Sequence, residues 1–327
     1  MLLRSAASYL LPIKAESLDG LDELTGYLTA LRDEVANLQT IVIDASPAAV
    51  FDEHRRQWGP ICHHIPPDAI ACLNGKVRGV LTGLRVAAHD KIVVADDDVR
   101  YDARSLARVV DSLDHAEVVR PQNFFQPATW HTTLDAARSL LNRISGGDWP
   151  GTLGVRRSAL PRGYDGDVLF ENLELVRTVR AHGGRELVAY DTYVARRPPT
   201  VRHFLGQRIR QAYDEFARPV RMSLMLSLLP GAAVAAYAGR DDLLCAFAGM
   251  AIVGAEAGRI RGGASAYFSL LSSVAAPLWI LERALCAWLA VAVRLRRGGI
   301  HYAGARIRNA ATPMRLLANR HGERRWS

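Results

Sequence analysis

Hydrophobic and polar positions follow two alternating patterns along roughly the first 220 residues. Short, uninterrupted apolar runs of the kind found in buried strands occur at 40–43 and 92–94. Other stretches repeat apolar residues at helical spacing, as Leu21, Leu24 and Leu28 do. This alternation predicts an α/β fold in which helices flank a mostly parallel sheet.

Capping residues and apolar runs bound the individual elements. We expect helix N-caps at Asp19, Asn74 and Asp102, and a helix that starts at Ser46 with Pro47 in its first turn. The expected strands lie at 8–13, 40–43, 61–65, 92–94, 117–120, 152–156 and 186–190.

The chain changes character after residue 220, where three long apolar stretches follow one another at 222–238, 243–257 and 267–293. The first two are marginal in length for crossing a bilayer, which takes about 20 residues. We expect them to form a membrane hairpin with its turn at 240–242, and the third to lie in the membrane plane, bent at Pro277. The alternative is that all three are buried core helices of a soluble protein.

The positive charge lies mostly at the C-terminal end. From Arg294 onward there are nine arginines and one acid, Glu323, and the formal net charge of the chain is +8. Directly after an apolar segment, such a run favours anionic lipid and the cytoplasmic side of a membrane over nucleic acid. The sequence therefore divides into a soluble-type domain at 1–218, apolar membrane helices at 219–297 and a basic cytoplasmic tail at 298–327.

Cysteine usage agrees with a reducing compartment. The four cysteines show neither CxxC spacing nor the density of a secreted scaffold. The first eleven residues are too interrupted by polar positions for a signal peptide, so we expect the 1–218 domain to stay in the cytoplasm.

Three consecutive acids, Asp96, Asp97 and Asp98, follow the most apolar strand. Ligands bind at the carboxyl edge of open α/β sheets, and side chains alternate along a strand, so Asp96 and Asp98 point the same way. Two carboxylates aimed at one place suit Mg²⁺ or Mn²⁺, which complete their coordination with substrate phosphates. The alternative is a solvated turn, because Asp is common in turns.

Four further positions belong to the same predicted edge. Asp44 ends the strand 40–43, and Lys76 lies in the first turn of the helix capped by Asn74, where a cation can meet phosphate. Glu171, near the start of a helix, or Asp167 could act as a general base if burial raised its pKa. A lone surface lysine and a helix-start acid are the alternatives.

A basic helix at 204–213 carries Gln207, Arg208 and Arg210, whose guanidinium groups match phosphate geometry. The alternative is that these arginines face solvent or lipid. His63 and His64 could bind a metal as a pair, but no further Cys or His stands at a familiar ligand spacing.

Taken in order, these motifs resemble family 2 glycosyltransferases of the GT-A fold, specifically membrane-attached members similar to ceramide glucosyltransferase. The resemblance covers about residues 8–217. Asp96-Asp97-Asp98 matches the DxD motif, and residues 207–211 look like the QxxRW signature. It implies metal ligands at Asp96 and Asp98, nucleotide-sugar contacts at Asp96 and Asp97, and further nucleotide-sugar contacts at Pro12, Lys14, Glu16, Asp44, Lys76, Gln207, Arg208 and Arg210.

The activity that this resemblance implies is inverting transfer of a sugar from a nucleoside-diphosphate sugar to an acceptor hydroxyl, with Mg²⁺ or Mn²⁺ required. From the apolar segments after residue 218 we expect the acceptor to be a lipid or lipid-linked molecule. From these segments and the arginines that follow, we expect the protein at the cell inner membrane with the catalytic domain facing the cytoplasm. Nucleic acid is not an expected partner.

Two positions depart from the family pattern. The Glu-Asp pair whose Asp acts as base is Glu171-Asn172 here, and an amide cannot accept that proton. Gln211 stands where the signature has Trp. These departures leave open a degenerate, membrane-tethered binding or scaffold protein. A sugar-nucleotide pyrophosphorylase is the other alternative, although 12–16 lacks the Gly-rich basic loop it would need.

Overall fold

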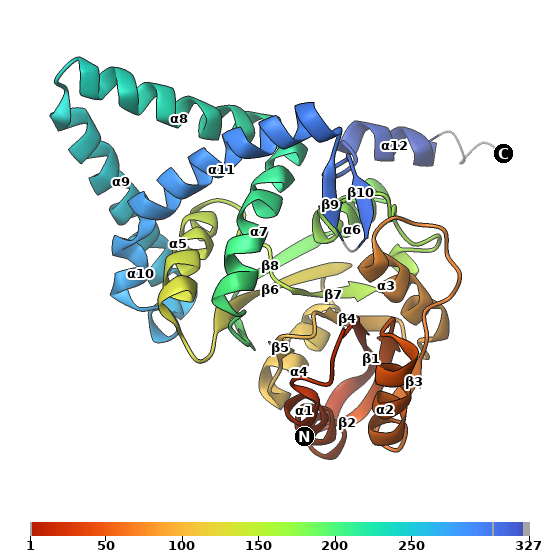
Figure 1. The fold of residues 1–327 in the computed structure, drawn as a ribbon. Helices are drawn as coiled ribbons and strands as arrows, with labels where there is room; N and C mark the ends of the chain where they lie inside the picture. The colour runs from red at the N-terminus through yellow and green to blue at the C-terminus, as the bar shows by residue number, and fades with distance from the viewer. Residues whose placement is uncertain (1, 303, 323–327) are drawn as a thin grey trace.

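The computed structural model describes residues 2–302 and 304–322. An eight-stranded sheet forms its centre, in the order β3-β2-β1-β4-β7-β6-β8-β5, with helices on both faces (Figure 1). This confirms the predicted α/β fold with a mostly parallel sheet. The strands are β1 (Leu2–Ile13), β2 (Ala36–Asp44), β3 (His63–Ile65), β4 (Lys91–Ala95), β5 (Val99–Arg100), β6 (Val118–Phe125), β7 (Thr152–Arg156) and β8 (Glu186–Arg196).

Strands β1 to β4 pair in parallel and have apolar residues on both faces. On β1, Tyr9 and Leu11 pack with α1 and α4, whereas Leu10 packs on the other face with α3. Burial on both faces explains why the strand runs were continuous rather than alternating. The helices beside the sheet are α1 (Leu21–Glu34), α2 (Ala48–Trp58), α3 (Gly75–Val86), α4 (Ala103–Ser112), α5 (Trp130–Ile144) and α6 (Glu171–Ala181).

The other half of the sheet mixes directions. β7 is antiparallel to both β4 and β6, and β6 is parallel to β8. β6 and β8 extend five or six residues beyond the predicted ends, because 122–125 pairs with 193–196 past a register shift. Polar residues at 122–123 and 191–192 hid these second halves from the apolar pattern.

Two of the four predicted helix starts are wrong. Asn74 and Asp102 cap their helices as expected, and Asp102 does so within a capping box. Helix α1, however, has Gly20 as its N-cap, and α2 begins at Ala48 after Pro47. Asp19 accepts a hydrogen bond from Ser17 Oγ instead, and Ser46 Oγ accepts one from the Ala15 N–H.

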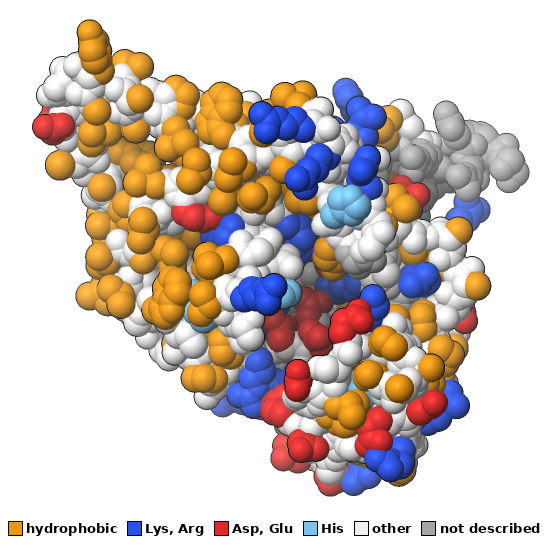
Figure 2. All heavy atoms as spheres, viewed as in Figure 1, with side chains coloured by type: hydrophobic (Ala, Val, Ile, Leu, Met, Phe, Trp, Pro, Cys, Tyr) orange, Lys and Arg blue, Asp and Glu red, His pale blue; other side chains and the backbone are white. Residues whose placement is uncertain are grey.

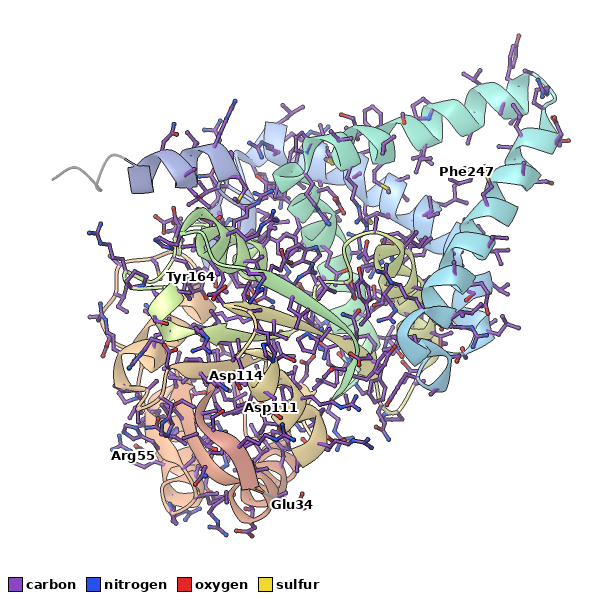
Figure 3. The ribbon with its side chains drawn as sticks, turned by 180° about the vertical axis from the view of Figure 1, so that it is seen from behind. Glu34, Arg55, Asp111, Asp114, Tyr164 and Phe247 are labelled. Atoms are coloured by element: carbon purple, nitrogen blue, oxygen red, sulfur yellow. The ribbon has the colours of Figure 1, made fainter. Side chains whose placement is uncertain are left out.

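The apolar stretches form helices that extend to one side of the sheet. They are α8 (Pro219–Tyr237), α9 (Asp241–Ile260), α10 (Leu270–Val274) and α11 (Ala276–Arg297), and they follow α7 (Val201–Tyr213) in the chain. α8 and α9 project as an arm, and Phe247 on this arm lies at the opposite end of the molecule from Glu34 and Arg55 (Figure 3).

Three of the described helices, those at 219–237, 241–266 and 276–297, are long and apolar enough to cross a membrane. The first two are almost entirely exposed, so they are not buried core helices. Helix α11 is half-buried, because one face packs on α5, α7 and α8. The predicted third stretch is not one helix. Ala275, two residues before Pro277, separates α10 from α11.

The described part of the basic tail is folded against the domain. β9 (Ile300–Tyr302) and β10 (Ala305–Ile307) form a hairpin, followed by α12 (Met314–Gly322). Asn309 bridges to Val168, and the Thr312 N–H donates to Glu174 Oε2 at 2.6 Å. We did not expect a hairpin or a further helix in this tail from the sequence. They cover the side of the domain where α6 begins (Figure 1).

Candidate active site

A cavity of about 950 Å³ opens at the carboxyl ends of β1 and β4, beneath α7. In Figure 2 it is the central hollow, and acidic side chains gather inside it. Pro12, near the end of β1, and Lys14 and Glu16, in the loop after it, line one wall. The cavity therefore lies at the edge where ligands bind in open α/β sheets.

The acids after β4 form part of the cavity floor. Asp98 accepts three contacts from Arg196, between 2.6 and 3.1 Å, and Asp96 Oδ2 lies 3.8 Å from the same guanidinium. Asp97 is exposed at the rim. Asp96 and Asp98 thus both approach Arg196, but they do so from a turn between β4 and β5, closed by the hydrogen bond from the Val99 N–H to the Asp96 carbonyl, and not from a continuing strand.

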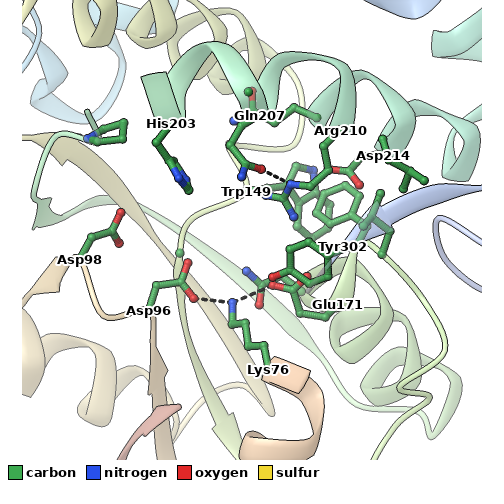
Figure 4. Close-up of a pocket in the computed structure, with 18 of the residues that line it drawn as sticks. Lys76, Asp96, Asp98, Trp149, Glu171, His203, Gln207, Arg210, Asp214 and Tyr302 are labelled. Atoms are coloured by element: carbon green, nitrogen blue, oxygen red, sulfur yellow. Dashed lines mark hydrogen bonds and ion pairs between the residues drawn. The ribbon is translucent and has the colours of Figure 1, made fainter. Parts of the chain in front are cut away.

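Lys76 joins the floor to the start of α6. Its Nζ lies 2.5 Å from Asp96 Oδ1 and donates to Glu171 Oε1 at 2.7 Å (Figure 4). Burial alone would lower the pKa of Lys76, but the two carboxylates outweigh it and raise the pKa above its usual value. Lys76 is therefore a permanent cation between two predicted site residues.

The Gly-rich loop at residues 146–151, directly before β7, approaches Asp96 closely. The Asp96 N–H donates to the Gly151 carbonyl at 2.8 Å, and a Cβ on Gly151 would lie 2.6 Å from Asp96 Oδ2. Asn172 Nδ2 donates to the Pro150 carbonyl at 2.9 Å. The amide that replaces the family's Asp therefore holds this loop in place.

Helix α7 presents a row of side chains to the cavity from above. His203, Gln207, Arg210 and Asp214 recur at intervals of three and four, so they share one helix face (Figure 4). Arg210 Nε donates a hydrogen bond to Gln207 Oε1, and the Arg210 guanidinium lies 4.9 Å from the ring centre of Tyr302. Tyr302 comes from the β9–β10 hairpin, which the sequence analysis did not identify.

Asp214 was likewise not among the site residues predicted from the sequence. It is half-buried, and its Oδ1 accepts no hydrogen bond in the part of the chain that the structure describes. Burial raises the pKa of Asp214 to about 7, with nearby Arg210 opposing this shift and Glu171 adding to it. A carboxylate with such a pKa is suited to accept a proton near neutral pH.

Three predicted residues, Arg208, Asp167 and Asp44, lie outside the cavity lining. Arg208 points from α7 toward α11, where it pairs with Asp135 at 2.7 Å and Glu282 at 2.5 Å. Asp167 is exposed and accepts a hydrogen bond from the Leu73 N–H.

Asp44 is buried rather than open to the cavity. His54 Nδ1 lies 2.7 Å and His64 Nε2 3.0 Å from its Oδ2, and the Ser46 N–H donates to its Oδ1. Burial raises the pKa of Asp44, but the hydrogen bonds from His64, Ser46 and His54 outweigh it and lower the pKa to about 2. Asp44, His54 and His64 could together hold a metal ion, and their mutual hydrogen bonds leave His64 Nδ1 without a partner among the described residues.

The structure also tests whether Asp96 and Asp98 suit a divalent ion. Both carboxylates open into the cavity, and each has lone pairs beyond those that meet Lys76 and Arg196. All the donors are hard oxygens, which Mg²⁺ and Mn²⁺ prefer. The residues therefore fit such an ion, with the two cations balancing the acids in its absence.

No family model and no curated protein matches the sequence. Among solved structures, a mannosyltransferase from Pyrobaculum calidifontis, in complex with GDP-Man and Mn²⁺, matches with a TM-score of 0.53 and 22% identity over 84% of this chain and 88% of that one. TarS of S. aureus with UDP-GlcNAc gives 0.42 at 13% identity, covering 61% and 60%. Glucosyl-3-phosphoglycerate synthase from Mycobacterium tuberculosis gives 0.41 at 16% identity, covering 62% and 75%.

These structural neighbours are GT-A-type nucleotide-diphospho-sugar glycosyltransferases. The chain has the GT-A fold: a mostly parallel sheet flanked by helices, with three apolar helices added toward the C-terminus. Because the sequence identity is low, the comparison shows the fold and nothing more.

Proposed function

We propose that the protein is a membrane-attached glycosyltransferase that moves a sugar from a nucleoside-diphosphate sugar to a lipid or lipid-linked hydroxyl. One observation carries this proposal: Asp96 and Asp98, Lys76 and the α7 row meet in a single cavity at the ligand-binding edge of a GT-A sheet. The mannosyltransferase of the same fold, solved with GDP-Man and Mn²⁺, supports the choice of donor class and metal.

In this proposal the donor lies across the floor of the cavity. Pro12, Lys14 and Glu16 line the nucleotide end, and Arg210, held by Gln207, faces the diphosphate. Asp96 and Asp98 would hold Mg²⁺ or Mn²⁺, which supplies positive charge next to the leaving diphosphate. Lys76 and Arg196 add fixed cations on the same side, and pre-oriented charges of this kind stabilise charge that develops in the transition state.

Three carboxylates compete for the role of general base. Asp167 lies outside the cavity lining, and Glu171 already shares its charge with Lys76. Asp214 lines the cavity, has a buried oxygen without a donor, and has a pKa near 7. We assign the proton transfer to Asp214, and we assign Glu171 to positioning Lys76. Attack by the activated hydroxyl on the face opposite the diphosphate would invert the anomeric centre.

The apolar helices support a membrane setting for the acceptor. On α8 and α9, Leu224, Val234, Met250 and Val253 are exposed. In Figure 2 hydrophobic side chains cover this side of the molecule. Large exposed apolar surfaces mark interaction with membranes or partners. We propose attachment to the inner membrane with the catalytic domain in the cytoplasm, and we keep the hairpin crossing by α8 and α9 as part of that proposal.

Donor turnover tests this function directly. Purified full-length protein is mixed with GDP-Man, UDP-GlcNAc or UDP-glucose, with and without Mn²⁺, and release of nucleoside diphosphate is measured. Metal-dependent release from one donor, lost in Asp98→Asn but kept in Asp52→Asn, would support the proposal. Asp52 is an exposed carboxylate on α2, away from the cavity.

Titration calorimetry with the same donors completes the test. Absence of binding to every donor in the presence of Mn²⁺ would refute the transferase. Binding without turnover would instead favour the degenerate, non-catalytic protein that Asn172 and Gln211 leave open. Formation of a nucleotide sugar from sugar phosphate and nucleoside triphosphate would favour the pyrophosphorylase.

A further inference from the structure

A dense cluster of charged residues lies where α5, α7 and α11 meet the segment 214–221 beneath the start of α8. We call it the α11 corner. Much of it lines the same cavity as Glu171 and Asp214. Its five arginines are Arg138, Arg208, Arg218, Arg221 and Arg283, and its four acids are Asp135, Asp148, Glu215 and Glu282.

Each of these four acids is already paired, whereas Asp214, the other acid of the segment 214–221, has no ion pair with these arginines among the described residues. Asp135 and Asp148 hold Arg138 at 3.1 and 2.6 Å. Asp135 also pairs with Arg208, and so does Glu282. Glu215 holds Arg218 at 3.0 Å and Arg221 at 3.2 Å. Four arginines thus share the four acids, and one arginine is left over.

The remaining arginine is Arg283, on the inner face of α11. Only 1% of its surface is exposed, and it lines the cavity. A hydrogen bond runs from its Nη2 to Gln211 Oε1 at 3.1 Å, and its Nε has no partner among the described residues. A buried charge without a counterion is costly. The α11 corner is therefore built to receive an anion from outside the chain.

We propose that the α11 corner binds the phosphate group of the lipid acceptor, so the acceptor is a phosphate-bearing lipid. This inference rests on the proposed function and narrows its acceptor class. Guanidinium groups match phosphate oxygens in a two-pronged geometry, and Arg283 has an unused Nε for that purpose. Gln211, which replaces the aromatic residue of the resembled signature, orients Arg283 by accepting from its Nη2.

The surroundings of the α11 corner favour a lipid over a free anion. Arg218 and Arg221 lie at the start of α8, whose later residues are apolar and exposed. On the outer face of α11, Leu278, Leu281 and Leu285 are 60%, 46% and 53% exposed. A phosphate beside Arg283 would therefore lie between the cavity and an apolar surface that can hold the acyl or prenyl chain.

Binding of a simple phosphate lipid tests this inference without any donor. Full-length protein in a neutral detergent is titrated with farnesyl phosphate, farnesol and inorganic phosphate. We expect farnesyl phosphate to bind at least tenfold more tightly than either of the others. Arg283→Gln should weaken farnesyl phosphate binding by about tenfold and leave farnesol unaffected. Arg283→Lys, which keeps the charge, should recover part of the loss.

Two controls keep the test decisive. Arg240→Gln removes an exposed arginine from the α8–α9 turn and should bind like the wild type. Melting temperature should not fall in Arg283→Gln, because an unpaired buried charge is removed. Equal affinity for farnesyl phosphate and farnesol, unchanged binding in Arg283→Gln, or inorganic phosphate binding as tightly as the lipid would each overturn the inference.

The outcome is separable from that of the proposed function. Farnesyl phosphate binding lost in Arg283→Gln would support the α11 corner even if no donor turned over. Glycosyl transfer to a neutral lipid at full rate in Arg283→Gln would refute phosphate binding by the α11 corner. It would still support the proposed transferase activity.

Discussion

Strands β2 and β4 lie on either side of β1 and both lead into aspartates, yet the two ends have different environments. The Asp44 carboxylate after β2 is buried, with its oxygens taken up by His54, His64 and Ser46. Asp96 after β4 opens into the cavity and meets only cations, Lys76 and Arg196. An acid at a strand end remains available to a ligand when its partners are cations at the edge of a cavity. It becomes part of the protein's frame when buried side chains enclose it.

The largest contrast should come from removing the charge at β4. We expect Asp96→Asn to lower metal-dependent donor turnover by about a thousandfold, because the metal and Lys76 both lose their anion. Melting temperature should change little. Turnover within tenfold of the wild type would show that Asp96 is a solvated turn residue, and the two strand ends would then not differ in function.

A third carboxylate, Asp214, extends the comparison, because it lies in the cavity but has no cation in hydrogen-bond contact. Asp214→Asn should lower turnover by about a hundredfold, the usual contribution of a general base. In the wild type, turnover should rise with pH through about 7 as Asp214 loses its proton, and this limb should vanish in the variant. Donor affinity should not change.

The competing assignment predicts a different pattern for these variants. If Glu171 is the base, Glu171→Gln should abolish the pH limb and Asp214→Asn should retain it. Stability gives a second check. A raised pKa means that the folded protein holds this proton more tightly than the unfolded chain, so stability falls as pH rises from about 4 to about 7 and the full cost remains above pH 7. Asp214→Asn should therefore be at least as stable as the wild type at pH 8.

At the β2 end the effect should fall on stability. We expect Asp44→Asn to lower the free energy of unfolding by about 2 kcal/mol, because an amide cannot accept from both histidines and Ser46 without presenting a donor to one of them. The native pKa near 2 lies below the unfolded value of 3.8, so this contribution is full above about pH 4. It should disappear between about pH 4 and 2, measured by denaturant unfolding.

Turnover per folded molecule should be nearly unchanged in Asp44→Asn. A large loss of donor affinity without loss of stability would instead place Asp44 in contact with the nucleotide, as the family resemblance implies.

The smallest effect should come from replacing Lys76, the cation that contacts both Asp96 and Glu171. Lys76→Met should raise the donor KM by about tenfold, since one charge-assisted contact to phosphate is lost. Asp96 and Glu171 would then face each other without Lys76, so the optimum Mn²⁺ concentration should also shift. An unchanged KM would indicate that Lys76 only neutralises the acids.

Local patterns were sufficient for much of this fold. The apolar run 92–94 identified the central strand, and the side chains of Asn74 and Asp102 cap their helices because their partners lie within three residues. Ser46 failed as a cap because its hydroxyl bonds to Ala15, 31 residues away. No local pattern records such a partner.

Local patterns also could not tell which predicted site residues face the cavity and which face other helices. Arg208 and Arg210 are two positions apart on one helix, so they cannot face the same way. Only the positions of α11 and the cavity show that Arg208 faces Glu282 while Arg210 faces Tyr302. Asp214 and Tyr302 match no motif, and their place in the cavity depends on contacts between segments far apart in sequence.

The Arg208–Glu282 ion pair has a practical consequence. A shortened protein that stops near residue 218, made to avoid detergent, would keep the eight-stranded sheet and Asp96, Asp97 and Asp98. It would lose Glu282 from beside Arg208 and Tyr302 from beside Arg210. Such a fragment could fold and still have a different cavity beneath α7, so its inactivity in an assay would say little about the intact protein.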